Sequence, residues 1–140
     1  MDRSPSLHLC AAFAAAAATA LLAGCATLGE TKAAEEVVKA RSQQRWNALI
    51  KREWSAAYPF HTPAYRALVT LDRYSSQFTS PVRWEAARPD SVLCEEKRCT
   101  VRVEVAFRLS LPQIRGGRSK SFIEETWVLE EGQWYYVERP

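Results

Sequence analysis

The spacing of apolar residues changes once along this chain, at Pro81, and that change restricts the folds available to it. Between Trp46 and Ala57 apolar residues recur at helical spacing, and neither Pro nor Gly interrupts the segment from Lys32 to Tyr58. After Pro81 apolar and polar residues alternate, which is typical of strands with one buried face. The pattern predicts an α+β domain in which helices precede an antiparallel sheet.

Turn and capping residues divide the first half into three predicted helices. The first runs from Lys32 to Tyr58-Pro59, where proline ends or kinks it. The second begins at Thr62-Pro63, and the third spans Leu71 to Phe78 with Thr70 as its N-cap. Apolar positions on the first helix face a core, and its charged positions are expected to be solvated, namely Glu35, Glu36, Lys39, Arg41 and Arg45.

Two cysteines suggest a register for the first strand pair. If Cys94 and Cys99 are directly opposed across a turn, their Cβ atoms come within reach of a disulfide. The predicted pairs are then Val92 with Val101, Ala86 with Phe107, Trp84 with Leu109, and Val82 with Leu111. Pro89 is a candidate bulge that would shift this register. We interpret the bridge as a structural staple, since the turn offers no helix N-terminus to activate a thiol.

A second hairpin is predicted around Glu131-Gly132, between strands 122–130 and 133–139. Its register pairs Leu129 with Trp134, Trp127 with Tyr136, Val128 with Tyr135 and Thr126 with Val137. The sequence therefore predicts a sheet of four antiparallel strands.

The N-terminus has the pattern of a targeting segment. Leu9 to Ala23 is apolar apart from Thr19, and it is short for a membrane-spanning helix. It ends in Leu22-Ala23-Gly24-Cys25, which resembles the lipobox of bacterial lipoproteins. The resemblance implies a signal peptide at 1–24, palmitate and related acyl chains on Cys25, a tether over 25–31, and one domain at 32–140. Ala26 implies passage to the outer membrane, facing the periplasm.

Composition excludes several classes of function. The net charge of +3 is mild and its charges are interspersed, so it does not favour nucleic acid. The predicted leader removes one basic and one acidic residue and leaves this balance unchanged. Of the two histidines, His8 lies in the predicted leader, so only His61 remains in the mature chain. With Cys25 lipidated and Cys94 bridged to Cys99, one histidine is too little for a metal site, and we expect no cofactor.

Several packing motifs carry a family resemblance. They are Trp46-Asn47-Ala48-Leu49-Ile50, Ala56-Ala57-Tyr58, Thr62-Pro63-Ala64-Tyr65-Arg66, Glu125-Thr126-Trp127-Val128 and Gly132-Gln133-Trp134-Tyr135. Together they resemble proteobacterial lipoproteins with a domain like nuclear transport factor two, the superfamily of SnoaL-like proteins and ketosteroid isomerase. The resemblance implies a cone-shaped, cystatin-like or SnoaL-like roll with three helices packed on the sheet. Because these motifs pack the fold, they do not assign an activity.

Catalytic candidates are few. Enzymes that the chain resembles use a His/Asp pair or an Asp base inside the cone, and His61, Asp72 and Asp90 match none of those positions. His61 is interpreted as a turn residue, with a catalytic base as the alternative. Glu125 shares a face with Trp127 and lies opposite Glu138. One interpretation places its side chain at the open rim of the cone, either solvated or paired with an arginine such as Arg66 or Arg73. The alternative is that it forms the polar floor or rim of a ligand site. We expect Glu125→Gln to leave the fold intact.

Two further surfaces follow from the predicted faces. Aromatic residues either fill the core or line an apolar pocket; the pocket candidates, with Glu125, are Trp54, Tyr58, Tyr65, Trp84, Phe107, Trp127 and Tyr136. On the opposite face a dimer or partner interface is expected at Phe122, Val128, Tyr135 and Val137. The favoured function is a non-catalytic, periplasmic binding or scaffolding domain of a lipoprotein, which binds an envelope protein, a second copy or a small apolar ligand, or supports an envelope assembly. The alternative is a SnoaL-like enzyme, an isomerase, dehydratase or hydrolase, that uses a cavity carboxylate.

Overall fold

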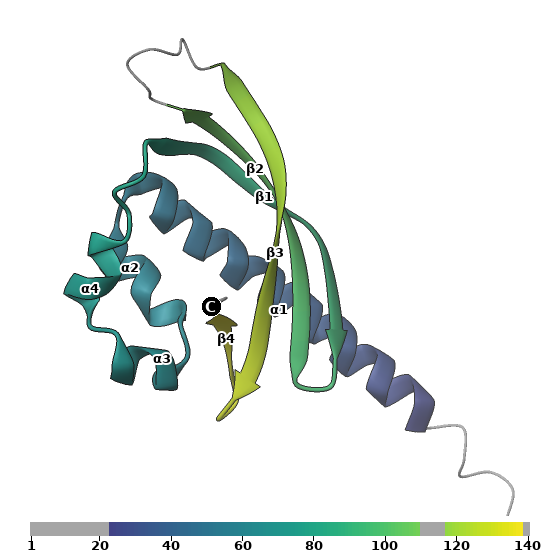
Figure 1. Ribbon diagram of the computed structural model, residues 1–140. Helices are drawn as coiled ribbons and strands as arrows, with labels where there is room; N and C mark the ends of the chain where they lie inside the picture. Colours follow the sequence, from purple (N-terminus) through teal and green to yellow (C-terminus); the bar gives the residue numbers. More distant parts are fainter. Residues whose placement is uncertain (1–22, 110–116, 139–140) are drawn as a thin grey trace, which may run out of the picture.

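One long helix, four short helical segments and a four-stranded antiparallel sheet make up the domain (Figure 1). The computed structural model describes residues 23–109 and 117–138, with side chains from Gly29 onward. Its strand order is β1-β2-β3-β4, a meander in which each strand pairs with the next. The α+β class and the four-stranded antiparallel sheet predicted from the sequence are therefore confirmed.

The helical half departs from the predicted three helices. Helix α1 spans Ala23–Lys51, α2 spans Trp54–Ala57, and a 3-10 turn, η1, spans Tyr58–Phe60. Helix α3 spans Pro63–Leu68 and α4 spans Leu71–Ser76. The predicted caps are confirmed, since the side chains of Thr62 and Thr70 accept hydrogen bonds from the backbone amides of Tyr65 and Arg73.

Both ends of the first predicted helix were misplaced. Residues 26–31, expected to be a tether, belong to α1, and three of the six, Ala26, Leu28 and Glu30, have good helix propensity. The helix then stops at Lys51 instead of Tyr58, because Arg52 adopts a left-handed conformation with φ of 62°. Figure 1 shows the first turns of α1 projecting beyond the sheet, while α2, α3 and α4 gather at its other end.

The sheet consists of β1 (Val82–Glu95), β2 (Arg98–Leu109), β3 (Arg118–Glu130) and β4 (Gln133–Val137). Around the disulfide the predicted register is confirmed: Cys94 pairs with Cys99 and Val92 with Val101, and the two cysteines are bridged. The β3–β4 hairpin has the predicted pairing from Thr126–Val137 to Leu129–Trp134.

Farther from the disulfide the predicted register was wrong. Trp84 pairs with Phe107 and Val82 with Leu109, because the ladder shifts once beyond Pro89, as suspected, and again at Glu85. The two bulges place Ala87 against the core and leave Ala86 exposed.

The core lies between α1 and the inner face of the sheet. The sheet contributes Cys99, Val101, Val103, Val105 and Trp127, and α1 contributes Val38, Trp46, Ala48 and Leu49. On α1 the buried positions also include Ser42 and Arg45, so the predicted solvation of Arg45 was wrong. Its position on the helix puts it on the same stripe as Val38 and Leu49. A charged side chain is thereby turned toward the sheet, where the candidate site lies.

Candidate functional site

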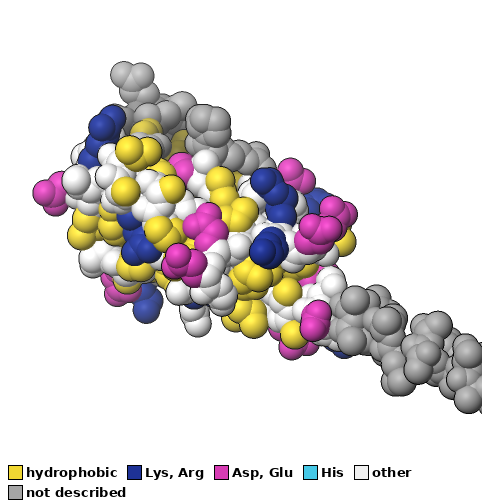
Figure 2. All heavy atoms as spheres, turned by 90° about the horizontal axis from the view of Figure 1, so that it is seen from below, with side chains coloured by type: hydrophobic (Ala, Val, Ile, Leu, Met, Phe, Trp, Pro, Cys, Tyr) yellow, Lys and Arg dark blue, Asp and Glu magenta, His cyan; other side chains and the backbone are white. Residues whose placement is uncertain are grey.

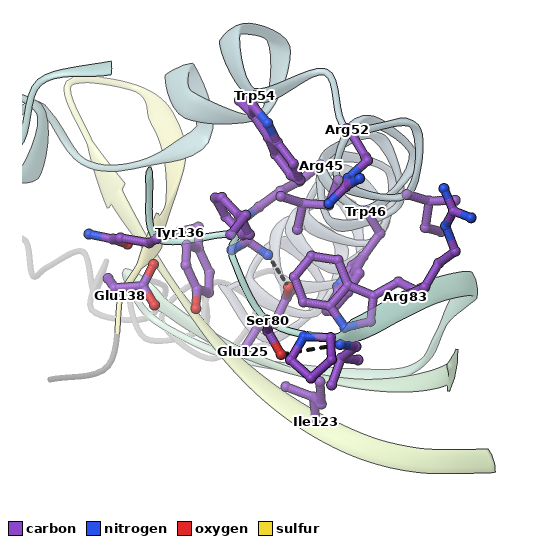
Figure 3. Close-up of a pocket in the computed structure, with 17 residues that line it drawn as sticks. Arg45, Trp46, Arg52, Trp54, Ser80, Arg83, Ile123, Glu125, Tyr136 and Glu138 are labelled. Atoms are coloured by element: carbon purple, nitrogen blue, oxygen red, sulfur yellow. Dashed lines mark hydrogen bonds and ion pairs between the residues drawn. The ribbon is translucent and has the colours of Figure 1, made fainter. Parts of the chain in front are cut away.

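A pocket of about 610 Å³ lies between the C-terminal half of α1, α2, the segment after α4, the start of β1, and the middle of β3 (Figure 3). Its volume falls within the range of sites that hold drug-sized ligands. The lining residues are Arg45, Trp46, Leu49, Ile50, Arg52, Trp54, Gln77, Phe78, Ser80, Pro81, Val82, Arg83, Trp84, Ile123, Glu125, Tyr136 and Glu138.

Four aromatic rings form a continuous wall of this pocket. Trp54 and Phe78 stack with centroids 4.2 Å apart and planes 4° apart. Phe78 meets Trp84 edge-on at 5.9 Å, and Trp84 meets Trp46 edge-on at 5.4 Å. Because these rings come from α1, α2, the segment after α4, and β1, the wall ties four separate elements together. We call Trp46, Trp54, Phe78 and Trp84 the aromatic wall.

Glu125 lies at the back of the pocket and accepts three hydrogen bonds. Its Oε1 accepts from the Arg45 guanidinium at 2.9 Å. Its Oε2 accepts from the Ser42 hydroxyl at 2.6 Å and from the Trp127 indole at 3.0 Å. The carboxylate is only 1% exposed. Three donors hold this buried carboxylate in place, and they occupy both of its oxygens.

These contacts correct the expectations for Glu125. The solvated-rim interpretation was wrong, because β3 turns the side chain into the core beside Trp127. Pairing with an arginine is present, but the arginine is Arg45 of α1, not Arg66 or Arg73. The sequence did contain a signal for this pair, because Ser42 and Arg45 fall on the buried stripe of α1 with Val38 and Leu49.

Glu138 lies across from Glu125 and is less constrained. The ring of Tyr136 and the carboxylate of Glu138 stand at the same side of the pocket (Figure 3). Burial raises the pKa of Glu138 above its ordinary value, with the charge of Arg45 acting in the opposite direction. Its side chain is 39% exposed. Of the two carboxylates that line the pocket, Glu138 is therefore the one that solvent or a ligand can reach.

His61 is buried outside the pocket. It lies in the predicted turn, between η1 and α3, but it is 0% exposed. Its ring stacks on Tyr65 at 4.4 Å and meets Tyr74 and Tyr136 edge-on. Burial, assisted by the charges of Arg45 and Arg66, lowers the pKa of His61 to about 3. At neutral pH this side chain is an uncharged member of an aromatic cluster.

The pocket prediction was correct for half of its members. Trp54, Trp84, Glu125 and Tyr136 line the pocket, whereas Tyr58, Tyr65, Phe107 and Trp127 do not. Tyr58 instead donates a hydrogen bond to the carbonyl of Val69, and Trp127 is fully buried in the core. Periodicity identified residues on the inner face, but it does not separate those that fill the core from those beside a cavity. Sequence reasoning also missed Arg52, Phe78 and Arg83.

The expected interface residues do not form one uninterrupted apolar surface. Phe122 is 49% exposed and lies under the guanidinium of Arg102, whose central carbon is 3.8 Å from the ring centroid. Val128, Tyr135 and Val137 are half-buried at the other end of β3. Figure 2 shows apolar, basic and acidic side chains interspersed on the face seen from below.

Comparisons with known proteins place the fold and go no further. No protein-family model matches the sequence, and no curated protein matches it. The fold is similar to the solution structure of RPA3114, a SEC-C motif containing protein from Rhodopseudomonas palustris. The TM-score is 0.56 at 17% identity, over 71% of this chain and 73% of that one. At this identity the likeness concerns the fold alone.

Two further observations bear on the kind of site. None of the described helices combines the length and the apolar character that a membrane crossing requires. Within residues 23–109 and 117–138, no group of three or more His, Cys, Asp or Glu side chains is placed to hold a metal ion.

Proposed function

We propose that this chain is a lipid-anchored, non-catalytic binding protein whose cone-shaped, SnoaL-like domain holds a small, largely apolar ligand. The observation that carries the proposal is the pocket of about 610 Å³ with its aromatic wall. A pocket lined by apolar rings with a few polar groups is the usual form of a small-molecule site. It favours a ligand over an expected protein partner, because large apolar rings are gathered inside the cleft.

The three hydrogen bonds that Glu125 already accepts support binding over catalysis. A SnoaL-like enzyme using this carboxylate would need an oxygen that can accept a substrate proton. Both oxygens instead accept hydrogen bonds from Ser42, Arg45 and Trp127. The uncharged, buried His61 lies outside the pocket lining and offers no replacement.

The proposed address is the periplasmic face of the outer membrane, through acyl chains on Cys25. The lipobox-like Leu22-Ala23-Gly24-Cys25 supports it, and so does the Cys94–Cys99 disulfide, since such bridges persist in oxidising compartments. Lipidation of an N-terminal cysteine supplies more than one acyl chain, which stable anchoring requires.

Metabolic labelling with an alkyne analogue of palmitate tests the proposed lipidation of Cys25. We expect label on the wild type and on Cys10→Ala but none on Cys25→Ala; equal labelling of all three contradicts the address.

Binding is tested with N-phenyl-1-naphthylamine, an uncharged aromatic probe. The full chain is placed in polymer nanodiscs, and probe emission is excited through tryptophan, because three of the five tryptophans belong to the aromatic wall. We expect a saturable signal above that of empty nanodiscs. A signal that rises in proportion to the probe, as in empty nanodiscs, contradicts a binding pocket.

A further inference from the structure

Two arginines at the pocket lack the partner that the third one has. Arg45 is buried and paired with Glu125. Arg52 and Arg83 also line the pocket, but both are exposed, and neither forms an ion pair with any residue in the described ranges. Figure 3 shows them on the side of the pocket away from Tyr136 and Glu138. One side of the pocket therefore carries uncompensated positive charge.

The charges around Arg83 add to this imbalance. Arg83 lies directly opposite Arg108 in the β1–β2 ladder, an arrangement that is unfavourable for like charges. The nearby carboxylate, Glu85, is already engaged by Arg108 at 3.0 Å and by Arg118 at 2.6 Å. Glu85 thus pairs with two of the three arginines at this end of the sheet, and Arg83 is left without it.

The backbone of Arg52 is the second observation. The amide of Glu53 donates to the carbonyl of Ala48 at 2.9 Å, and the amide of Arg52 donates to that of Leu49 at 3.1 Å. This is the Schellman pattern at the end of α1, with Arg52 at the left-handed position, φ 62°, that glycine ordinarily occupies. A residue with a Cβ is strained there. Unlike glycine, arginine places a charged side chain at this position. The guanidinium carbon of Arg52 lies 5.9 Å from the ring centroid of Trp54.

Glu138, the less constrained of the two carboxylates that line the pocket, stands on the side away from Arg52 and Arg83 (Figure 3). Glu138 would repel a negative group placed next to it, whereas Arg52 and Arg83 would attract one. The polarity of the pocket thus sets the direction in which an asymmetric ligand enters. Its charged end lies at the arginines, and its apolar body lies along the aromatic wall.

We infer that the pocket selects anionic amphiphiles, molecules with one carboxylate, sulfonate or phosphate group and an apolar body, and that Arg52 and Arg83 bind the anionic group. The inference rests on the proposed function, since it presupposes that the pocket binds a small ligand. Guanidinium groups suit it because their planar array of donors matches such oxyanions.

A matched pair of probes tests the inference. 8-Anilino-1-naphthalenesulfonate carries the same aromatic body as N-phenyl-1-naphthylamine with one added sulfonate. Both are titrated into the full chain in nanodiscs, with Arg52→Gly and Arg83→Gln as variants. Arg98→Gln, an exposed arginine at the far end of β1 and β2, is the control. We expect each variant to weaken sulfonate binding about fivefold, the double variant about 20-fold, and the control not at all. Binding of the uncharged probe should be the same in all proteins.

The stability of Arg52→Gly separates a ligand-binding role from a structural one. Because glycine suits the left-handed position, we expect the midpoint of chemical unfolding to be unchanged or raised. Equal losses for both probes, or a sulfonate affinity that is independent of the two arginines, overturn the inference and leave the proposed function standing. If neither probe binds the wild type saturably, both the inference and the proposed function fail.

Discussion

Arg45 and Glu125 form a buried ion pair between α1 and the inner face of the sheet. Both side chains are almost fully buried, and both have further neighbours: Ser42 and Trp127 donate to the carboxylate, and the Arg45 guanidinium carbon lies 3.6 Å from the centroid of Tyr136. Removing one charge of a buried pair leaves the other uncompensated, which costs about 3–5 kcal/mol. The expectation that Glu125→Gln leaves the fold unaffected therefore has to be reversed.

We predict that Glu125→Gln lowers the free energy of unfolding by about 3 kcal/mol, because Arg45 stays charged and buried. Arg45→Met combined with Glu125→Gln should recover much of that loss, since the amide oxygen still accepts from Ser42 and Trp127 and no lone charge remains. Denaturant unfolding of the two variants and the wild type measures this. A single variant as stable as the wild type would show that the ion pair is not structural.

His61 makes stability depend on pH. Its pKa is about 3 in the folded chain, against about 6.5 when unfolded. Between these values the unfolded chain binds a proton that the folded chain does not, so stability falls as pH falls. The contribution of the neutral, buried His61 to the free energy of unfolding is fully present above pH 6.5. It is lost as the pH falls toward 3, by about 1.4 kcal/mol for each pH unit. The raised pKa of Glu138 acts in the opposite direction.

We predict that His61→Phe flattens this dependence. Phenylalanine preserves a ring beside Tyr65 and Tyr74, removes two ring nitrogens that have no hydrogen-bond partner among the described residues, and cannot titrate. Unfolding midpoints at pH 7, 6, 5 and 4 should diverge, with the wild type losing more stability at each step. Parallel curves for the two proteins would mean that His61 takes up no proton on unfolding.

Among the elements, the β1–β2 hairpin is tied by the Cys94–Cys99 bridge at its closed end. In the chain-entropy account a bridge that closes so short a loop contributes about 2 kcal/mol. We predict that reductant lowers the unfolding free energy of the wild type by about that amount and leaves Cys94→Ala/Cys99→Ala unchanged. Identical unfolding of the wild type with and without reductant would contradict a stabilising bridge.

How much of each element could be predicted from the sequence depended on whether its signal was local. The helix starts at Thr62 and Thr70 and the β3–β4 turn have local residue signals, and they were placed correctly. The end of α1 was missed because an arginine occupies the position where glycine would have marked it. The bulge at Glu85 was missed because no Pro or Gly marks that position; the contacts of Glu85 are long-range, to Arg108 and Arg118 on two other strands.

The same distinction holds for the candidate site. Alternation placed Glu125 and Tyr136 on the inner face, and both line the pocket. The partner of Glu125 was misassigned, because pairing across 80 residues depends on how α1 crosses the sheet, which no local pattern specifies. Arg52, Phe78 and Arg83 were missed because each lies at or beyond the end of an element, or at the edge of the sheet, where periodicity carries little information.

At the scale of the whole molecule, α1 connects the proposed anchor to the proposed binding site. Cys25 lies in its first turns, and Arg45, Trp46 and Leu49 near its other end line the pocket. At about 1.5 Å per residue, twenty helical residues separate the two by roughly 30 Å along the axis. If Cys25 is lipidated, a helix with this rise offers the ligand pocket some distance from the membrane surface.

The central claim, that the aromatic wall encloses a ligand site, is tested most directly by 19F NMR of the full chain labelled with 5-fluorotryptophan. The five tryptophans divide into Trp46, Trp54 and Trp84 of the wall, and Trp127 and Trp134, which are buried outside the pocket lining. Titration with 8-anilino-1-naphthalenesulfonate is predicted to shift the three wall resonances saturably and to leave the other two in place. Five unmoved resonances, or shifts in Trp127 and Trp134 as large as those of the wall, would contradict the claim.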